Sequence, residues 1–105
     1  MARRLDIIGV VDATGTIFAT GAVTVTDVAT KIPTTNLVNR KAITIMNLDM
    51  ANTVYIGNSD VTTTTGFALL PYTTFPIDLS SGAQIYGICD AGKTASVRYL
   101  EVDNG

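Results

Sequence analysis

The sequence predicts an all-β protein, an antiparallel β-sandwich or small barrel of about seven to eight short strands. Apolar and polar residues alternate in short segments, turn residues recur roughly every ten residues, and no window carries an apolar stripe of helical period. The 105 residues have the length of one domain with a single hydrophobic core. We expect residues 1–20 to form an N-terminal arm or hairpin and residues 21–105 to form the sandwich.

The clearest strand pattern lies within residues 39–66. The segments ITI (43–45) and VYI (54–56) alternate with neutral or polar neighbours, and the polar sequence LDMAN between them has the length of a hairpin loop. We therefore expect these two strands to pair with each other at the centre of the sandwich. Val61 to Thr65 is expected to be short and extended.

The same alternation predicts strands in the rest of the chain. They cover residues 23–32, 67–70, 74–79, 85–89 and 95–102. Asp27-Val28 breaks the phase of the first of them, which suggests a bulge, and Pro33 ends it. Pro76 has no amide hydrogen to donate, so we expect residues 74–79 to lie at a sheet edge. Asp90-Ala91-Gly92-Lys93 is expected to form a hairpin turn before the last strand.

Residues 1–20 contain two short apolar runs, LDIIGVV and TIFAT, joined by DATG. A first hairpin with Gly15 in its turn fits this pattern. A flexible arm that reaches outside its own subunit fits it equally well. In the second case Arg3, Arg4, Ile7 and Ile8 would contact the shell or a neighbouring subunit.

The composition argues against two classes of partner. Charged residues make up 15% of the chain and its net charge is −2. Without a basic stripe, we expect no nucleic-acid partner. No run approaches the roughly eighteen apolar residues that a membrane span needs, so we expect no membrane partner. Threonine occupies many polar positions, as suits outward strand faces.

No residue pattern indicates a catalytic or metal site. The chain has no histidine, the commonest general base and metal ligand, and its aspartates lack the spacing of a calcium loop. Cys89, the single cysteine, has no histidine to activate it and is expected to be a small buried hydrophobe. A fold without a disulfide suits a reducing cytosol. We expect a non-enzyme with no cofactor and no metal.

Two polar segments are candidate contact sites. Arg40 and Lys41 precede the central strand, where they would pair with an acidic patch of a neighbouring shell protein, form a solvated strand end, or pair internally with Glu101 or Asp103. The threonine run would either be a solvated loop or add a strand to a neighbour. This run comprises Thr62, Thr63, Thr64 and Thr65.

Four further residues on or after the predicted strands are singled out, two asparagines and two tyrosines. Asn47 and Asn58 each follow a strand and are expected to be turn formers whose amides bond the backbone two residues on. Tyr55 and Tyr86 lie opposite their isoleucine neighbours on predicted strands. They would either pack in a minor core with the hydroxyl at its rim or present a recognition surface.

The ordered set of strand sequences resembles a small β-sandwich module of tailed-bacteriophage virion proteins. The set is VTVT, ATKIP, NRKAITIMN, VYIGNSDVT, GFALLP, PIDL, AQIYGI and ASVRYLEV. In that module the first strand ends at a proline, Asn-Arg opens the central strand, the next carries Tyr-Ile-Gly, and the last ends in Val-Arg-x-x-Glu. The resemblance covers residues 21–103 and leaves residues 1–20 outside.

This resemblance implies a structural role in the virion. The expected function is capsid decoration, in which a cement protein binds the major capsid protein and stabilises the outer shell. The implied assembly is a homotrimer formed in the host cytoplasm. The alternative is a binding module on a tail, collar or fibre that contacts a host surface glycan or protein. Glycan sites favour exposed aromatic rings, and the few phenylalanines and tyrosines of this chain fall mostly within strand patterns.

Overall fold

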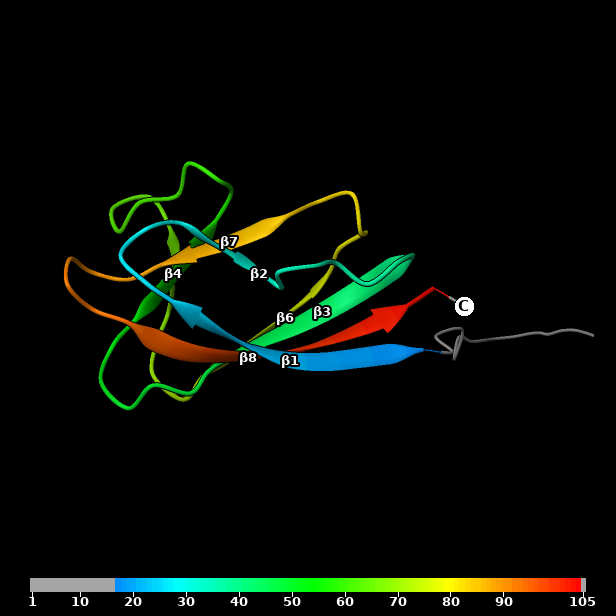
Figure 1. Cartoon of the computed structure of the whole chain (residues 1–105), viewed down its shortest axis with the longest axis horizontal. Coiled ribbons are helices and arrows are strands. Elements are labelled where there is room, and N and C mark those ends of the chain that lie inside the picture. The colour runs from blue at the N-terminus through cyan, green and yellow to red at the C-terminus, as the bar shows by residue number, and fades with distance from the viewer. Residues whose placement is uncertain (1–16, 105) are drawn as a thin grey trace, which may run out of the picture.

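The computed structural model describes residues 17–104, and these form eight strands in two antiparallel sheets of four, with no helix in that range (Figure 1). The predicted all-β sandwich is therefore confirmed. The strands are β1 (Phe18–Val25), β2 (Thr30–Ile32), β3 (Arg40–Asn47), β4 (Val54–Gly57), β5 (Phe67–Leu69), β6 (Thr74–Asp78), β7 (Ile85–Ile88) and β8 (Ala95–Asp103).

The strand order gives the sandwich its connectivity. One sheet runs β1-β8-β3-β6 and the other runs β2-β7-β4-β5. Of the strands that follow each other in sequence, only β4 and β5 pair, and every other connection between described strands crosses from one sheet to the other. This is the connectivity of an eight-stranded jelly roll.

The expected pairing of the two central strands is wrong. β3 lies between β8 and β6, whereas β4 lies between β7 and β5 in the opposite sheet. The loop LDMAN has hairpin length, but it arches from one layer to the other. Asn47 holds this arch, because its buried side-chain amide donates to the Asn52 carbonyl (2.9 Å) and to the Leu69 carbonyl (3.0 Å) of the second sheet.

Two further expected connections also cross between the layers. The bulge predicted at Asp27-Val28 is a full break, since β1 ends at Val25 and β2 begins in the other sheet. The turn at residues 90–93 forms, with Lys93 N donating to the Asp90 carbonyl (2.9 Å) and Gly92 at a φ of 75°. It links β7 to β8 across the layers, so it is not a hairpin turn.

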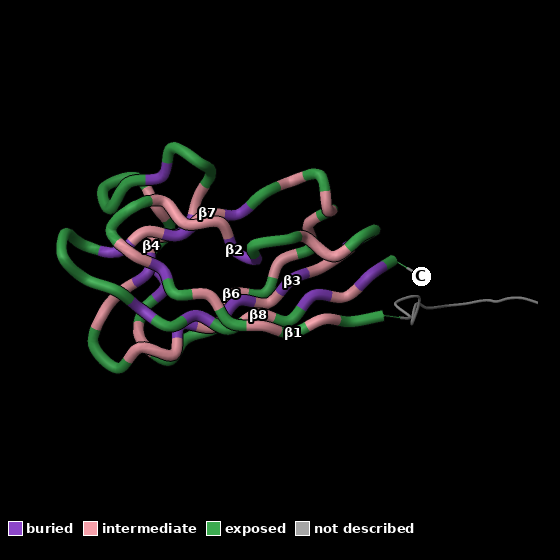
Figure 2. The backbone as a smooth tube through the Cα atoms, viewed as in Figure 1, coloured by how far each residue is buried: buried purple, intermediate pink, exposed green. Residues whose placement is uncertain are grey.

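The core fills the space between the sheets, where the buried stretches of Figure 2 face each other. Its members come from both layers and are almost completely shielded from water, which stabilises the fold by about 1.5–3 kcal/mol for each large apolar side chain. The best-buried apolar residues are Val25, Ile32, Ile43, Ile45, Val54 and Val97. The alternation of buried and more exposed residues along β3, β4 and β8 follows the predicted period of two.

Several boundaries agree with the sequence. β6 is an edge strand, with Pro76 in register with Thr44 of β3, and β2 ends directly before Pro33. β1 begins at Phe18, ahead of the expected boundary at Gly21. The candidate contact residues Arg3, Arg4, Ile7 and Ile8 lie outside the described residues.

Candidate interaction surfaces

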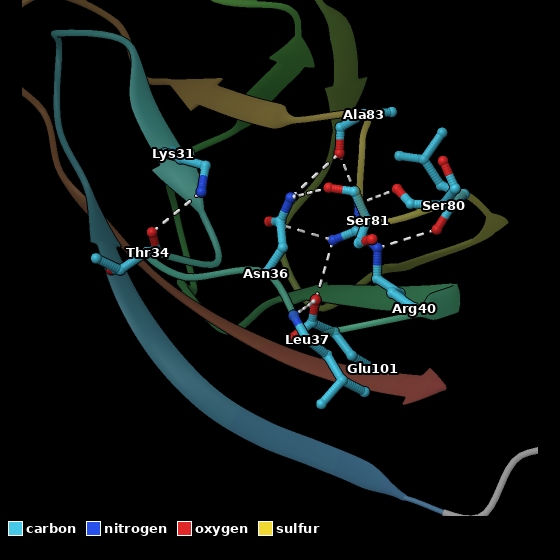
Figure 3. Close-up of polar contacts among 10 residues, drawn as sticks. Lys31, Thr34, Asn36, Leu37, Arg40, Ser80, Ser81, Ala83 and Glu101 are labelled. Atoms are coloured by element: carbon cyan, nitrogen blue, oxygen red, sulfur yellow. Dashed lines mark hydrogen bonds and ion pairs between the residues drawn. The ribbon is translucent and has the colours of Figure 1, made fainter. Parts of the chain in front are cut away.

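Arg40 is buried at one end of the sandwich, where it joins the connection before β3 to the loop after β6 (Figure 3). All five of its N–H groups have acceptors, and its partner in a buried ion pair is Glu101 of β8, with Nη1 and Oε2 3.0 Å apart. The other acceptors are the carbonyls of Leu79 (3.0 Å), Ser80 (2.9 Å) and Ala83 (2.7 Å) and the side-chain oxygen of Asn36 (3.4 Å).

The rest of this cluster is also paired. Glu101 Oε2 accepts from Leu37 N (3.1 Å), and Asn36 Nδ2 donates to the Ser81 carbonyl (2.8 Å). The internal pair of Arg40 with Glu101, one of the expected arrangements, is confirmed. The guanidinium has no N–H left for a neighbouring shell protein. The polar hollow of about 320 Å³ beside it, lined in part by Asn39 and Asn104, therefore lacks an available guanidinium donor.

Lys41 lies beside Arg40 at a break in the ladder between β3 and β8, where the register shifts. Its backbone carbonyl accepts from Leu79 N (2.9 Å), which ties the start of β3 to the end of β6. The side chain is half-buried. A contact between Lys41 and a neighbouring protein stays a prediction.

The threonine run is compact, not extended as expected. Thr62 Oγ1 accepts from Thr64 N (3.3 Å) and Thr65 N (3.1 Å), and Gly66 N donates to the Thr62 carbonyl (2.9 Å). A threonine hydroxyl that bonds nearby amides in this way competes with extended structure. The run, including Thr63, is exposed, but it offers no flat backbone to which a neighbour could add a strand.

Both asparagines form the expected turns. Asn47 Oδ1 accepts from Asp49 N and Asn58 Oδ1 accepts from Asp60 N, each at 2.9 Å. Asp49 adds a second turn after Asn47, because Ala51 N donates to its carboxylate at 2.9 Å. The hydrogen bonds from backbone amides hold the pKa of Asp49 below its ordinary value. These side chains shape loops.

Cys89 is buried, and its Sγ lies 3.7 Å from the Val25 carbonyl as a weak donor. Burial is the main cause that raises the pKa of the thiol to about 11, and nearby aspartates add to it. The thiol therefore stays protonated near neutral pH and is a poor nucleophile.

The two strand tyrosines lie on the outward side of the sheet β2-β7-β4-β5. Tyr55 is in register with Ile88, and Tyr86 with Gly57, and each tyrosine is half-buried. The Tyr86 hydroxyl contacts Gln84 Oε1 at 3.4 Å. This placement fits both interpretations, packing and recognition.

The outward side of the other sheet, β1-β8-β3-β6, has few charges. We call it the outer face, and only Arg98 and Asp78 carry a charge on it. Leu100, 40% exposed, lies at its centre between Thr20 and Thr44. By register its residues are Phe18, Thr20, Ala22, Thr24, Ala42, Thr44, Met46, Thr74, Pro76, Asp78, Ser96, Arg98, Leu100 and Val102.

The outer face is not flat. Thr44, Met46, Thr74 and Leu100 take part in lining a shallow, almost wholly apolar hollow of about 220 Å³. This surface is not among the contact sites predicted from the sequence. Its signal was there in part, because the outward positions of the predicted strands hold threonine and alanine in place of lysine and glutamate. Only the strand order brings these positions together.

A second apolar group, which we call the corner cluster, lies around β5 and the turn after it. Phe67, Leu70 and Tyr72 are each more than half exposed. Phe67 also stacks on Phe75 of β6 at a centroid distance of 5.2 Å, which closes this side between the two sheets. Tyr72 has a φ of 59°, an uncommon conformation for a bulky residue.

No group of histidine, cysteine, aspartate or glutamate residues in the range 17–104 is placed to hold a metal ion. Within the same range no helix is long and apolar enough to cross a membrane. Comparisons with protein-family models, with curated proteins and with solved structures find no match for this chain. The resemblance to the phage module therefore rests on the strand sequences alone.

Proposed function

We propose that this chain is a non-enzymatic structural protein of a tailed-phage virion and, within that class, a capsid decoration protein. In this role it binds the major capsid protein through the outer face and stabilises the shell from outside. The observation that carries the proposal is the outer face, a four-stranded surface with exposed apolar side chains and few charges on a rigid scaffold. Surfaces of this kind on soluble proteins mark sites of protein contact.

Two features of the molecule support this role. Jelly rolls recur in viral capsid proteins, which is an analogy at the level of the fold. The outer face lies on β1, β8, β3 and β6, whose inward sides pack into the core, so binding would need little rearrangement. Many weak contacts, repeated over a shell, add up to stable attachment.

The test is sedimentation of the purified protein with empty shells of the major capsid protein. Leu100→Glu places a charge at the centre of the outer face and should weaken binding about tenfold or more, since central apolar contacts dominate interfaces. Val38→Glu is the matched control, because Val38 is exposed in the connection before β3 and is not one of the outer-face residues. A wild-type protein that stays in the supernatant, or equal binding by the two variants, would refute the proposal.

The corner cluster favours a second candidate, a tail, collar or fibre module that contacts a host surface glycan or protein. The exposed rings of Phe67 and Tyr72 were not expected, and sugars stack on such rings. Jelly rolls also occur in lectins. The copy number in purified particles separates the candidates: a band comparable with that of the major shell protein indicates decoration, and a trace band indicates a tail or vertex part.

The finer expectations stay predictions. They include the homotrimer and shell contacts through Lys41, the threonine run or the N-terminal residues. Removal of residues 1–16 tests the last of these, because the truncated chain keeps β1 whole. A truncated protein that folds but no longer sediments with shells would support a lacing arm.

A further inference from the structure

The four edge strands of the sandwich differ in how they are protected from pairing with another chain. β6 contains Pro76 and Asp78, β2 is three residues long with Lys31 at its middle, and β5 is also three residues long. Proline, charge and shortness are the usual means of blunting an edge. β1 has eight residues, FATGAVTV, with no proline and no charge.

The edge of β1 is long and regular. β1 pairs with β8 over its whole length without a register shift, and with no other strand among residues 17–104 (Figure 1). Exposed apolar side chains lie at the start of this edge. Ile17, just before the strand, is 58% exposed and Phe18 is 68% exposed. A long, uncharged edge of this kind is a template for a further strand.

We propose that β1 pairs antiparallel with β1 of a second copy of this chain, so that the sheet continues across a two-fold axis. The absence of charge along β1 favours a second copy, because self-pairing then brings no like charges together. This inference concerns the isolated chain, does not depend on the virion role, and is an alternative to the homotrimer expected from the sequence.

A pair centred on Gly21 makes use of the exposed end of the strand. Directly opposite residues of antiparallel strands share a face, so a symmetric pair is centred on a residue. With Gly21 at the centre, Ile17 lies opposite Val25 of the second copy and Phe18 opposite Thr24. The exposed Phe18 side chain then gains a neighbour, whereas Val25 is fully buried and offers no surface to Ile17.

Gly21 itself has a close neighbour at this edge. A Cβ atom at Gly21 would overlap the Tyr99 ring, so the glycine lets Tyr99 extend across β1. The Tyr99 hydroxyl forms no hydrogen bond with any residue in the described range. In the proposed pair the two Tyr99 hydroxyls approach the same axis, where each gains a polar partner.

The first test measures the mass of the full chain in solution by sedimentation equilibrium, up to a concentration on the order of 100 µM. The wild type should form a reversible dimer. Thr20→Glu should raise the dissociation constant about tenfold or more by bringing two carboxylates near the axis. Thr74→Glu is the matched control, since Thr74 is an exposed threonine at the protected edge β6 of the same sheet, and it should dimerise like wild type.

A second experiment tests the symmetry of the contact. Because residue 20 lies near its own counterpart in the pair, a mixture of Thr20→Glu and Thr20→Lys should form heterodimers in clear excess over the statistical share, as counted by native mass spectrometry. Heterodimers at the statistical share alone would overturn the proposal. So would a wild type that stays monomeric or forms trimers, or equal weakening by Thr20→Glu and Thr74→Glu.

Hydrogen exchange on the wild type needs no variant. Raising the protein concentration through the dimer range should slow exchange of amides in β1 and leave those in β6 unchanged. Protection that rises equally in both strands, or in neither, would count against pairing at β1.

Discussion

At the scale of single residues, Arg40 organises one end of the sandwich. Its guanidinium bonds to Glu101 of β8 and to three backbone carbonyls of the loop after β6. Asn36 Nδ2 also donates to the Ala83 carbonyl (3.4 Å) and Leu37 N to the Glu101 carboxylate (3.1 Å), so the guanidinium lies at the centre of a shared network that fixes the loop. A planar group with five donors suits this task, and a lysine ammonium with three does not.

The first prediction concerns this residue. Arg40→Met should lower the free energy of unfolding by about 3–5 kcal/mol, because it leaves the Glu101 carboxylate buried without its counter-ion. Urea denaturation measures the change. Arg98→Met is the control, since Arg98 is an exposed arginine on β8 of the same sheet, and it should change stability by no more than about 0.5 kcal/mol. An equal loss of unfolding free energy in the two variants would show that the buried ion pair is no more important to stability than an exposed arginine.

The roles of single residues could be predicted from the sequence where their hydrogen bonds reach only nearby residues. Asn47 and Asn58 bond amides two residues ahead, and that chemistry is visible in a short window. Arg40 was harder, because all of its acceptors except Asn36 lie about forty or sixty residues away in the sequence. The sequence pattern around Arg40 therefore could not decide between an ion pair with Glu101 and a contact with a neighbouring protein.

At the scale of elements, the turn between β5 and β6 carries an unusual backbone conformation. Tyr72 has a φ of 59°, while the other positive-φ residue outside glycine in the range 17–104 is Asn39, a residue type that tolerates it. The Tyr72 amide donates to the Asn47 carbonyl (2.8 Å), which fixes the turn. An exposed aromatic residue held in this conformation is a reason to look for function here.

The second prediction follows from that strain. Tyr72→Asn should raise the free energy of unfolding by about 1 kcal/mol, because asparagine adopts the left-handed conformation at lower cost and the exposed ring contributes little packing. Thermal and urea denaturation both measure it. Leu70→Asn, an equally exposed neighbour without a positive φ, should not stabilise the fold. If the second candidate function holds, the same Tyr72→Asn variant should lose host-surface binding while its stability rises.

The strands themselves were largely predictable, but their partners were not. Alternation in residues 43–45 and 54–56 shows which side chains face inward, and both segments are strands with buried isoleucine or valine. Alternation carries no information on which strand lies alongside. A short loop such as LDMAN serves a hairpin or an arch equally well, and the buried amide of Asn47 decides for the arch.

At the scale of the whole molecule, the strand order creates the candidate site. Leu100 of β8 and Thr44 of β3 are far apart in sequence, and only the order β1-β8-β3-β6 sets them side by side on the outer face. The contact sites predicted from the sequence are therefore loops, a strand end and the N-terminal segment, and they do not include the sheet face. The corner cluster was missed for the same reason, since Phe67 and Phe75 meet across two sheets.

The last prediction concerns cooperativity. Because every described connection except that between β4 and β5 crosses the layers, neither sheet can separate without disrupting the other. Val25 and Val97 of one sheet also share a core with Ile32 and Val54 of the other. The protein should therefore unfold in a single transition, with equal calorimetric and van't Hoff enthalpies. Refolding should take milliseconds to seconds, as expected for non-local strand pairing.

Tyrosine fluorescence provides the control for this prediction. Tyr55 and Tyr86 report on the sheet β2-β7-β4-β5 and Tyr99 on the other sheet, so wild type and Tyr99→Phe weight the two layers differently. If the layers unfold together, each protein should give one midpoint that agrees with its far-ultraviolet circular dichroism. Midpoints that separate within either protein would show that one sheet survives without the other, against the interlocked connectivity on which both the rigid outer face and the exposed β1 edge depend.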